Sequence, residues 1–233
     1  MSEETLDETP KRKPFQRLMG AYNEIARVMA DLGYNDSQDA EALERAVRSA
    51  PRFMLETVTG RWSDVQENVI KAMTGPIQSG SGMVVVSDMR SLLVCPHHFT
   101  AAEVRCDLAF VQDSKTVGVG SIHEVFEQLC RQPVLMERLA AQIATLFGPE
   151  IEDTAEYDKA DKVLRGLLQE LDSRGPRMST AGCMVRLSSS MICACKPGRQ
   201  HRASAKFVVQ ETNGVFRSAA VISEASALLG RAV

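Results

Sequence analysis

The residues best suited to chemistry lie in the stretch LLVCPHHFTA, which contains two of the four histidines of the 233-residue chain. Cys95 and His98 are separated by two residues, a spacing at which a thiolate and an imidazole can bind one metal ion. His97 does not have to be a ligand, and an imidazole beside a metal suits proton transfer near neutral pH. A catalytic zinc site needs a third protein ligand and leaves its fourth position to water.

Candidates for the third ligand lie late in the chain, in the stretch MICACKPG. Cys193 and Cys195 follow a segment with strand character, and by residue type either one can complete the set. The alternative is that a Cys-x-x-His pair and a remote cysteine occur together by chance. Cys106, Cys130 and Cys183 have apolar neighbours and are expected to be small core residues.

The composition argues against several classes of function. Lys and Arg number 27 against 30 Asp and Glu, a net charge of −3, so no overall positive charge attracts nucleic acid or an anionic membrane. No apolar run approaches the roughly 20 residues of a membrane-spanning helix. The opening MSEETLDETPKRKP lacks the apolar stretch of a secretory signal. We therefore expect a cytoplasmic protein with reduced thiols and neither nucleic acid nor membrane as a partner.

The first elements that must position these residues are helical. Residues 1–13 are polar and are expected to form a disordered tail. Residues 14–75 are expected to form an N-terminal helical region, which opens with an apolar stripe at helical spacing. Further helices are expected at about 38–49 and 51–73, separated at SAPRF and followed by the loop TGPIQSGSG.

The pattern then changes to strands. Residues 82–95 predict a long strand leading into the Cys-His cluster, and residues 101–113 alternate as its partner. The stretches SIHEVFEQLC and PVLMERLAAQIATLFG predict two helices, with Pro133 in the first turn of the second. Strands at about 179–195 and 204–211 precede a closing helix. This order predicts an α+β fold with an antiparallel sheet.

The chain resembles the GTP cyclohydrolase I family in several ordered blocks. The family hallmark C-E-H-H plus an apolar residue is matched by CPHHF. MVVVSDM before it and LAFVQD after it resemble the family's strands. TVGVGSIHEVFEQLCRQPVLMERLAAQIA, SSSMICACKPG and FVVQETNGVFR resemble its later segments in the same order. The resemblance covers about residues 15–151 and 179–217.

What this resemblance implies is a tunnelling fold, an antiparallel sheet with helices on one face whose sheets close into a ring on oligomerisation. Residues 82–233 would form the catalytic domain, with the charged stretch 152–178 as an exposed helix or helical insertion. Relatives of this type form decamers whose active sites are shared between subunits, so a homo-oligomer is expected. The implied reaction is zinc-dependent opening of the guanine imidazole ring of GTP at C8. Formate leaves, and 7,8-dihydroneopterin triphosphate or a related pterin or 7-deazaguanine precursor is formed.

The resemblance also assigns the metal ligands. Cys95, His98 and Cys193 match the three zinc ligands of the family, and zinc would lower the pKa of a bound water molecule toward neutrality. Cys193 is preferred over Cys195 because its distance from Gly198 equals that of the ligand from the family's corresponding glycine.

Two further positions match residues that act on the substrate. His97 matches the catalytic histidine, the alternative being a surface or supporting histidine. Glu137 matches the glutamate that binds the guanine edge, the alternative being a solvated helix residue paired with Arg138.

Departures from the family pattern concern proton transfer and phosphate binding. Met191 stands where the family has a second histidine, and Pro197 where it has an arginine. The Ser-Lys pair that contacts the triphosphate is Gly120-Ser121 here, and a following arginine is Glu124. Ser121 is the candidate that remains from this phosphate clamp.

A basic group after the late cysteine offers other phosphate ligands. His201 within it is also a candidate to replace the missing imidazole, and a basic loop that is simply exposed to water is the alternative. Two other functions stay open: a diverged enzyme that acts on another purine nucleotide or stops at ring opening, and a non-catalytic zinc protein of assembly or regulation. The candidate phosphate ligands are Lys196, Arg199, His201 and Arg202.

Overall fold

The computed structural model describes most of the chain, which divides into two compact units, residues 1–59 and 60–233. The domain boundaries expected from the sequence stay predictions. The described ranges are 12–33, 37–55, 62–74, 78–96, 101–113, 115–149, 162–174, 178, 180–190 and 206–231.

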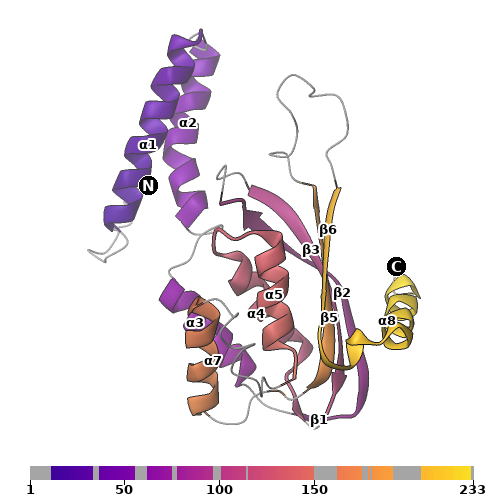
Figure 1. Ribbon diagram of the computed structural model, residues 1–233. Helices are drawn as coiled ribbons and strands as arrows, with labels where there is room; N and C mark the ends of the chain where they lie inside the picture. The colour runs from indigo at the N-terminus through magenta and orange to yellow at the C-terminus, as the bar shows by residue number, and fades with distance from the viewer. Residues whose placement is uncertain are drawn as a thin grey trace. The chain divides into compact units, whose positions relative to one another are not determined.

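The first unit is a pair of helices, α1 (Arg12–Asp31) and α2 (Ser37–Phe53), which run side by side (Figure 1). Apolar residues at helical spacing line the groove between them, among them Met19 and Ala26 from α1 and Val47 from α2. The expected break at SAPRF is wrong, because α2 continues through Pro51 to Phe53. Pro51 lacks the amide that would donate to the Val47 carbonyl, and α2 ends two residues later.

The second unit is built on a four-stranded antiparallel sheet in the order β2-β3-β5-β6. This confirms the expected α+β class with an antiparallel sheet. The strands are β2 (Gly82–Val94), β3 (Ala101–Gln112), β5 (Thr180–Ser190) and β6 (Lys206–Thr212). A separate two-stranded ladder pairs β1 (Gln78–Ser79) with β4 (Lys115–Thr116).

Helices α4 (Val119–Cys130) and α5 (Met136–Leu146) cover one face of the sheet (Figure 1). Their buried faces join the main core, together with α3 (Trp62–Met73). The other face also carries a helix: α8 (Ala219–Arg231), after the short 3-10 helix η3 (Gly214–Arg217), contributes to a smaller apolar cluster there. The second cluster contains Ala109, Met184, Phe216, Ala225 and Leu229.

Helix α7 (Lys162–Arg174) is part of the main core. The sequence suggested an exposed helix or insertion, and exposure is wrong for its apolar stripe, which is buried. Gln66 of α3 donates a hydrogen bond from Nε2 to Glu170 of α7 at 2.9 Å. The charged residues of α7 therefore cover a leucine face that packs inward. The buried leucines are Leu164, Leu167, Leu168 and Leu171.

The junction between α4 and α5 is attached to the end of β2. Pro133 was expected in the first turn of the second helix, but α5 begins at Met136. Pro133 instead forms an isolated parallel bridge with Val94, and the Val134 amide donates to the Val94 carbonyl at 3.3 Å. Proline can occupy this position because the neighbouring residue supplies the amide donor.

Candidate functional site

The two segments expected to carry metal ligands leave the sheet at the same end. Both β2 and β5 are antiparallel to β3, which lies between them, so β2 and β5 are parallel to each other. Val94 pairs with Ala101 of β3, and Ser189 pairs with Val104. The carboxyl ends of β2 and β5 are therefore separated by one intervening strand.

Cys95 is the expected ligand that the structure describes. It directly follows β2, is buried with 6% of its surface exposed, and forms no disulfide. His97 and His98 lie outside the described residues, between Pro96 and Ala101.

The third expected ligand also lies outside the described residues. Cys193 follows Ser190, the last residue of β5, by three positions in the sequence. Within the described ranges, no three or more His, Cys, Asp or Glu side chains gather closely enough to hold a metal ion. Met191, Cys195 and the candidate phosphate ligands Lys196, Arg199, His201 and Arg202 fall outside these ranges too.

Glu137 lies in the first turn of α5 and is exposed. The bridge between Val94 and Pro133 attaches the start of this helix to the carboxyl end of β2. The structure therefore brings Glu137 and Cys95 to the same end of the sheet. A carboxylate in the first turn of a helix is favoured by the helix dipole.

Ser121 lies elsewhere in the same chain. It is half-buried in the first turn of α4, whereas the bridge to Val94 follows the last turn of that helix. The rise of an α-helix separates Ser121 from Cys130 by roughly 13 Å along the axis. Within one chain, Ser121 is thus not brought to the end of the sheet that carries Cys95.

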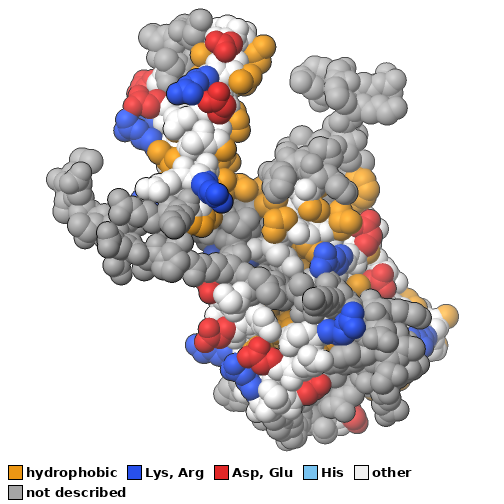
Figure 2. Space-filling view, turned by 60° about the vertical axis from the view of Figure 1, so that its left-hand side comes forward, with side chains coloured by type: hydrophobic (Ala, Val, Ile, Leu, Met, Phe, Trp, Pro, Cys, Tyr) orange, Lys and Arg blue, Asp and Glu red, His pale blue; other side chains and the backbone are white. Residues whose placement is uncertain are grey.

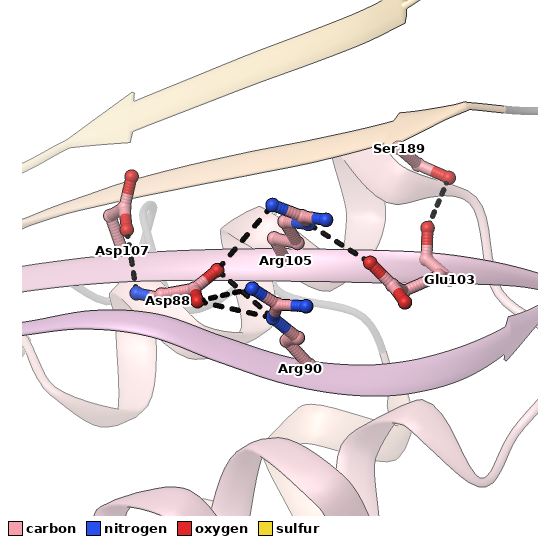
Figure 3. A network of polar contacts seen from close by, with 6 residues as sticks. All are labelled: Asp88, Arg90, Glu103, Arg105, Asp107 and Ser189. Carbon is pink, nitrogen blue, oxygen red and sulfur yellow. Dashed lines mark hydrogen bonds and ion pairs between the residues drawn. The ribbon is translucent and has the colours of Figure 1, made fainter. Parts of the chain in front are cut away.

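A network of charged side chains on the face of the sheet opposite α4 and α5 was missed by sequence reasoning (Figure 3). Arg90 Nη2 donates to Asp88 at 2.6 Å, and Arg105 Nη1 lies 3.7 Å from the same carboxylate. Arg105 Nε also donates to Glu103 at 2.9 Å. The hydrogen bonds from Arg90 hold the pKa of Asp88 below its ordinary value. Charged residues at alternate positions in EVRCD were the available signal.

The remaining described cysteines are core residues, as expected. Cys106, Cys130 and Cys183 are fully buried. Burial raises the pKa of each thiol, that of Cys183 to about 12, so these thiols are protonated and unreactive at neutral pH.

The surface of the first unit combines both charge signs with apolar side chains. Acidic and basic residues are interspersed along its two helices in Figure 2, and hydrophobic side chains also reach the surface there. Ile25 and Val28 of α1 and Leu32, which directly follows this helix, are exposed apolar residues. Among the described residues, no helix is long and apolar enough to cross a membrane.

Comparison with known proteins shows the family of this chain. Residues 21–155 match the family model described as GTP cyclohydrolase I. The chain belongs to this family of hydrolases.

Individual relatives are distant. The chain is 29% identical over 154 residues to GTP cyclohydrolase 1 of Mannheimia succiniciproducens, covering 62% of this chain and 66% of the relative. It is 25% identical over 189 residues to GTP cyclohydrolase 1 of Rhodopirellula baltica, covering 81% and 76%. It is 26% identical over 143 residues to GTP cyclohydrolase 1 of Saccharomyces cerevisiae, covering 61% of this chain and 56% of the relative. The matched part thus spans from just over half to three quarters of these relatives.

Among solved structures, the match to the apo form of the archaeosine synthase QueF-Like covers 59% of this chain and 97% of the chain of that protein. Its sequence identity is 15% and its TM-score 0.34, a similarity too low to bear on the fold or function of this chain.

Proposed function

We propose that this protein is a zinc-dependent GTP cyclohydrolase I-like enzyme. It would open the imidazole ring of GTP at C8, release formate and form 7,8-dihydroneopterin triphosphate. The observation that carries this proposal is that the carboxyl ends of β2 and β5 lie at the same end of the sheet, with one strand between them. The segment that leads into α5 is bridged to the carboxyl end of β2. The segments with Cys95, Cys193 and Glu137 start from these three points.

The expected donor set fits zinc. Two thiolates and one imidazole, from Cys95, Cys193 and His98, are ligands that tetrahedral zinc prefers, and three protein ligands leave one position for water. The buried thiol of Cys95, at the end of a well-paired strand, supports a fixed ligand position. Zinc, when bound, supplies a Lewis acid that makes water a nucleophile at neutral pH.

Two side chains of this chain would act on the purine. His97, next to a ligand, would hold and transfer the protons that ring opening requires. Glu137 would accept hydrogen bonds from N1–H and the 2-amino group of guanine, a donor pair that adenine lacks. Glu137 is exposed in the single chain, and bound guanine or a neighbouring subunit would cover it.

Phosphate binding would draw on two sources. Lys196, Arg199, His201 and Arg202 follow Cys193 closely in sequence and would bind phosphate oxygens by charge-assisted hydrogen bonds. Ser121, at the far end of α4 from the bridge to β2, would reach the triphosphate of a neighbouring subunit's site. A shared site of this kind requires an oligomer.

We also propose a homo-oligomer, a decamer by analogy with the family. In the strand order β2-β3-β5-β6, strands β2 and β6 are the two edges of the sheet. The β6 edge exposes Phe207 and Val208, and open apolar edges tend to pair with another chain. Pairing β6 of one subunit with β2 of the next would close a ring. A cytoplasmic location is proposed with it, supported by the reduced state of the described cysteines, none of which forms a disulfide.

The test of the activity is to incubate the zinc-loaded protein with GTP and measure formate and pterin fluorescence. Glu137→Gln should lower kcat/KM about 100-fold, because the amide has one accepting oxygen and no charge, whereas the ionised carboxylate can accept hydrogen bonds from both N1–H and the 2-amino group. Glu127→Gln, an exposed glutamate of α4, is the matched control and should leave the rate unchanged. Absence of formate with GTP, dGTP, GMP and guanosine would contradict the proposal.

A further inference from the structure

A one-residue bulge interrupts β2 upstream of Cys95. From Val86 to Met89 strand β2 advances three residues, while its partner β3 advances two, from Leu108 to Cys106. Asp88 in the bulge has a φ of 54°, and it is the one non-glycine residue of the described chain with a positive φ. A left-handed residue in one strand is a common way to accommodate an extra residue in a sheet.

Upstream of the bulge, the even-numbered residues of β2 face α4 and α5. Val84 and Val86 pack against the main core. Met83 and Val85 pack against the smaller cluster on the opposite face, the cluster that includes residues of α8.

Downstream of the bulge, the odd-numbered residues face α4 and α5. Met89 and Leu93 belong to the main core, and the side chain of Ser91 hydrogen-bonds with Cys130 of α4. Continued by two residues, one step past the end of β2, the same alternation would place Cys95 on this face; Cys95 is buried, as is its neighbour Val94. Because side chains alternate with a period of two, a strand without the bulge would turn all four residues to the other face.

The side chain and the amide of Asp88 are both held. Arg90 donates from Nε and Nη2 to its carboxylate, and Arg105 approaches it across the strand pair (Figure 3). The Asp88 amide donates to Asp107 Oδ1 at 3.0 Å. The ion pairs are about half exposed, so each contributes little by itself. They converge, however, on the residue that needs the left-handed conformation, which aspartate tolerates better than most residues.

We propose that Asp88 is a positioning residue for the metal site: by holding the bulge, it sets the face of β2 from which Cys95 emerges. The consequence for metal binding rests on the proposed function, whereas the effect on Cys95 itself does not. A residue on the face of the sheet opposite α4 and α5 would thereby control a ligand at the end of the sheet.

The first test measures the environment of Cys95 without metal. In Asp88→Val a β-branched residue disfavours the left-handed conformation, and alkylation of Cys95 by N-ethylmaleimide, followed by peptide mass spectrometry, should become at least about 10-fold faster. Asp88→Gly, which adopts positive φ freely, should keep the slow rate. Ser87→Val places the same side chain at the adjacent position, where φ is not positive, and should also keep it.

Cys106, directly opposite Met89, reports on the fold in every variant. If Cys106 also reacts quickly in Asp88→Val, the sheet has opened in that variant. Asp88→Ala is then used instead, and it should accelerate the alkylation of Cys95 about 3-fold. The proposal would be overturned if Cys95 is still labelled slowly in Asp88→Val or, where that variant exposes Cys106, in Asp88→Ala.

The second test follows the metal itself, with cobalt as a spectroscopic probe for zinc. In Asp88→Val the thiolate-to-cobalt charge-transfer band should fall to about half, as in Cys95→Ser, and zinc affinity should fall about 10–100-fold. An unchanged cobalt spectrum in the folded variant would contradict the role of Asp88. If the unsubstituted protein binds no cobalt or zinc, the proposed function fails, and the labelling experiment still decides whether Asp88 sets the face of Cys95.

Discussion

In the proposed reaction, proton transfer during ring opening would depend on single imidazole side chains. His97 is one candidate, and the position where the family has a second histidine is occupied by Met191. A thioether neither donates nor accepts a proton at neutral pH. The protein would therefore work with one imidazole fewer, or with His201 in its place.

Restoring the histidine tests this interpretation. Met191→His should raise kcat for GTP by about 10-fold, below the 10²–10⁴ that a well-placed general acid or base contributes. Met191→Leu, which keeps the size and lacks the imidazole, should leave kcat unchanged. The measurement is initial-rate pterin fluorescence at saturating GTP. A histidine variant no faster than the leucine variant would mean that the proton path runs elsewhere, with His201 the next residue to replace.

At the scale of single residues, the sequence predicted the burial of several thiols but not the backbone conformation of Asp88. The buried thiols of Cys106, Cys130 and Cys183 followed from their apolar neighbours, whereas the burial of Cys95 was not predicted. The left-handed conformation of Asp88 was not predictable. In the stretch VVVSDM, apolar residues fall at both odd and even positions. The hydrophobic pattern therefore does not show that the strand contains an extra residue.

At the scale of elements, hydrophobic periodicity predicted the hairpin of β2 and β3, because long alternating strands leave little choice of partner. It also predicted a helix where α7 lies. It did not predict that this helix is buried on one side, since burial depends on a complementary face presented by α3 from a distant part of the sequence. Because the outer face of α7 is highly charged, the sequence suggested an exposed helix although its leucines pack in the core.

A truncation in α7 measures that role. Leu167→Ala should lower the free energy of unfolding by about 2–5 kcal/mol, because it leaves a cavity in the main core. Gln169→Ala, at an exposed position of the same helix, should change it by less than about 0.5 kcal/mol. Urea denaturation followed by circular dichroism gives both values. Equal, small effects would mean that α7 is dispensable for the stability of the second unit.

At the scale of the whole molecule, the fold leaves the proposed site incomplete. Cys95 and Glu137 lie at one end of the sheet, whereas Ser121 lies at the far end of α4 from that point. Among the described strands, β2 and β6 form the two edges of the sheet. A neighbouring subunit paired along an edge would address both features, since it would satisfy the open strand and bring a second α4 toward the site.

A charge placed on the edge tests this assembly. Val208→Lys, at an exposed residue of β6, should shift the mass measured by light scattering from that of the oligomer to that of smaller species, because a lysine on an edge strand opposes pairing. GTP turnover should fall with the oligomer if the site is shared. Gln169→Lys adds the same charge on the outer face of α7 and should preserve both mass and activity. A monomeric Val208→Lys variant that retains full turnover would show that one chain contains the complete site, and Ser121 would then have no part in binding phosphate.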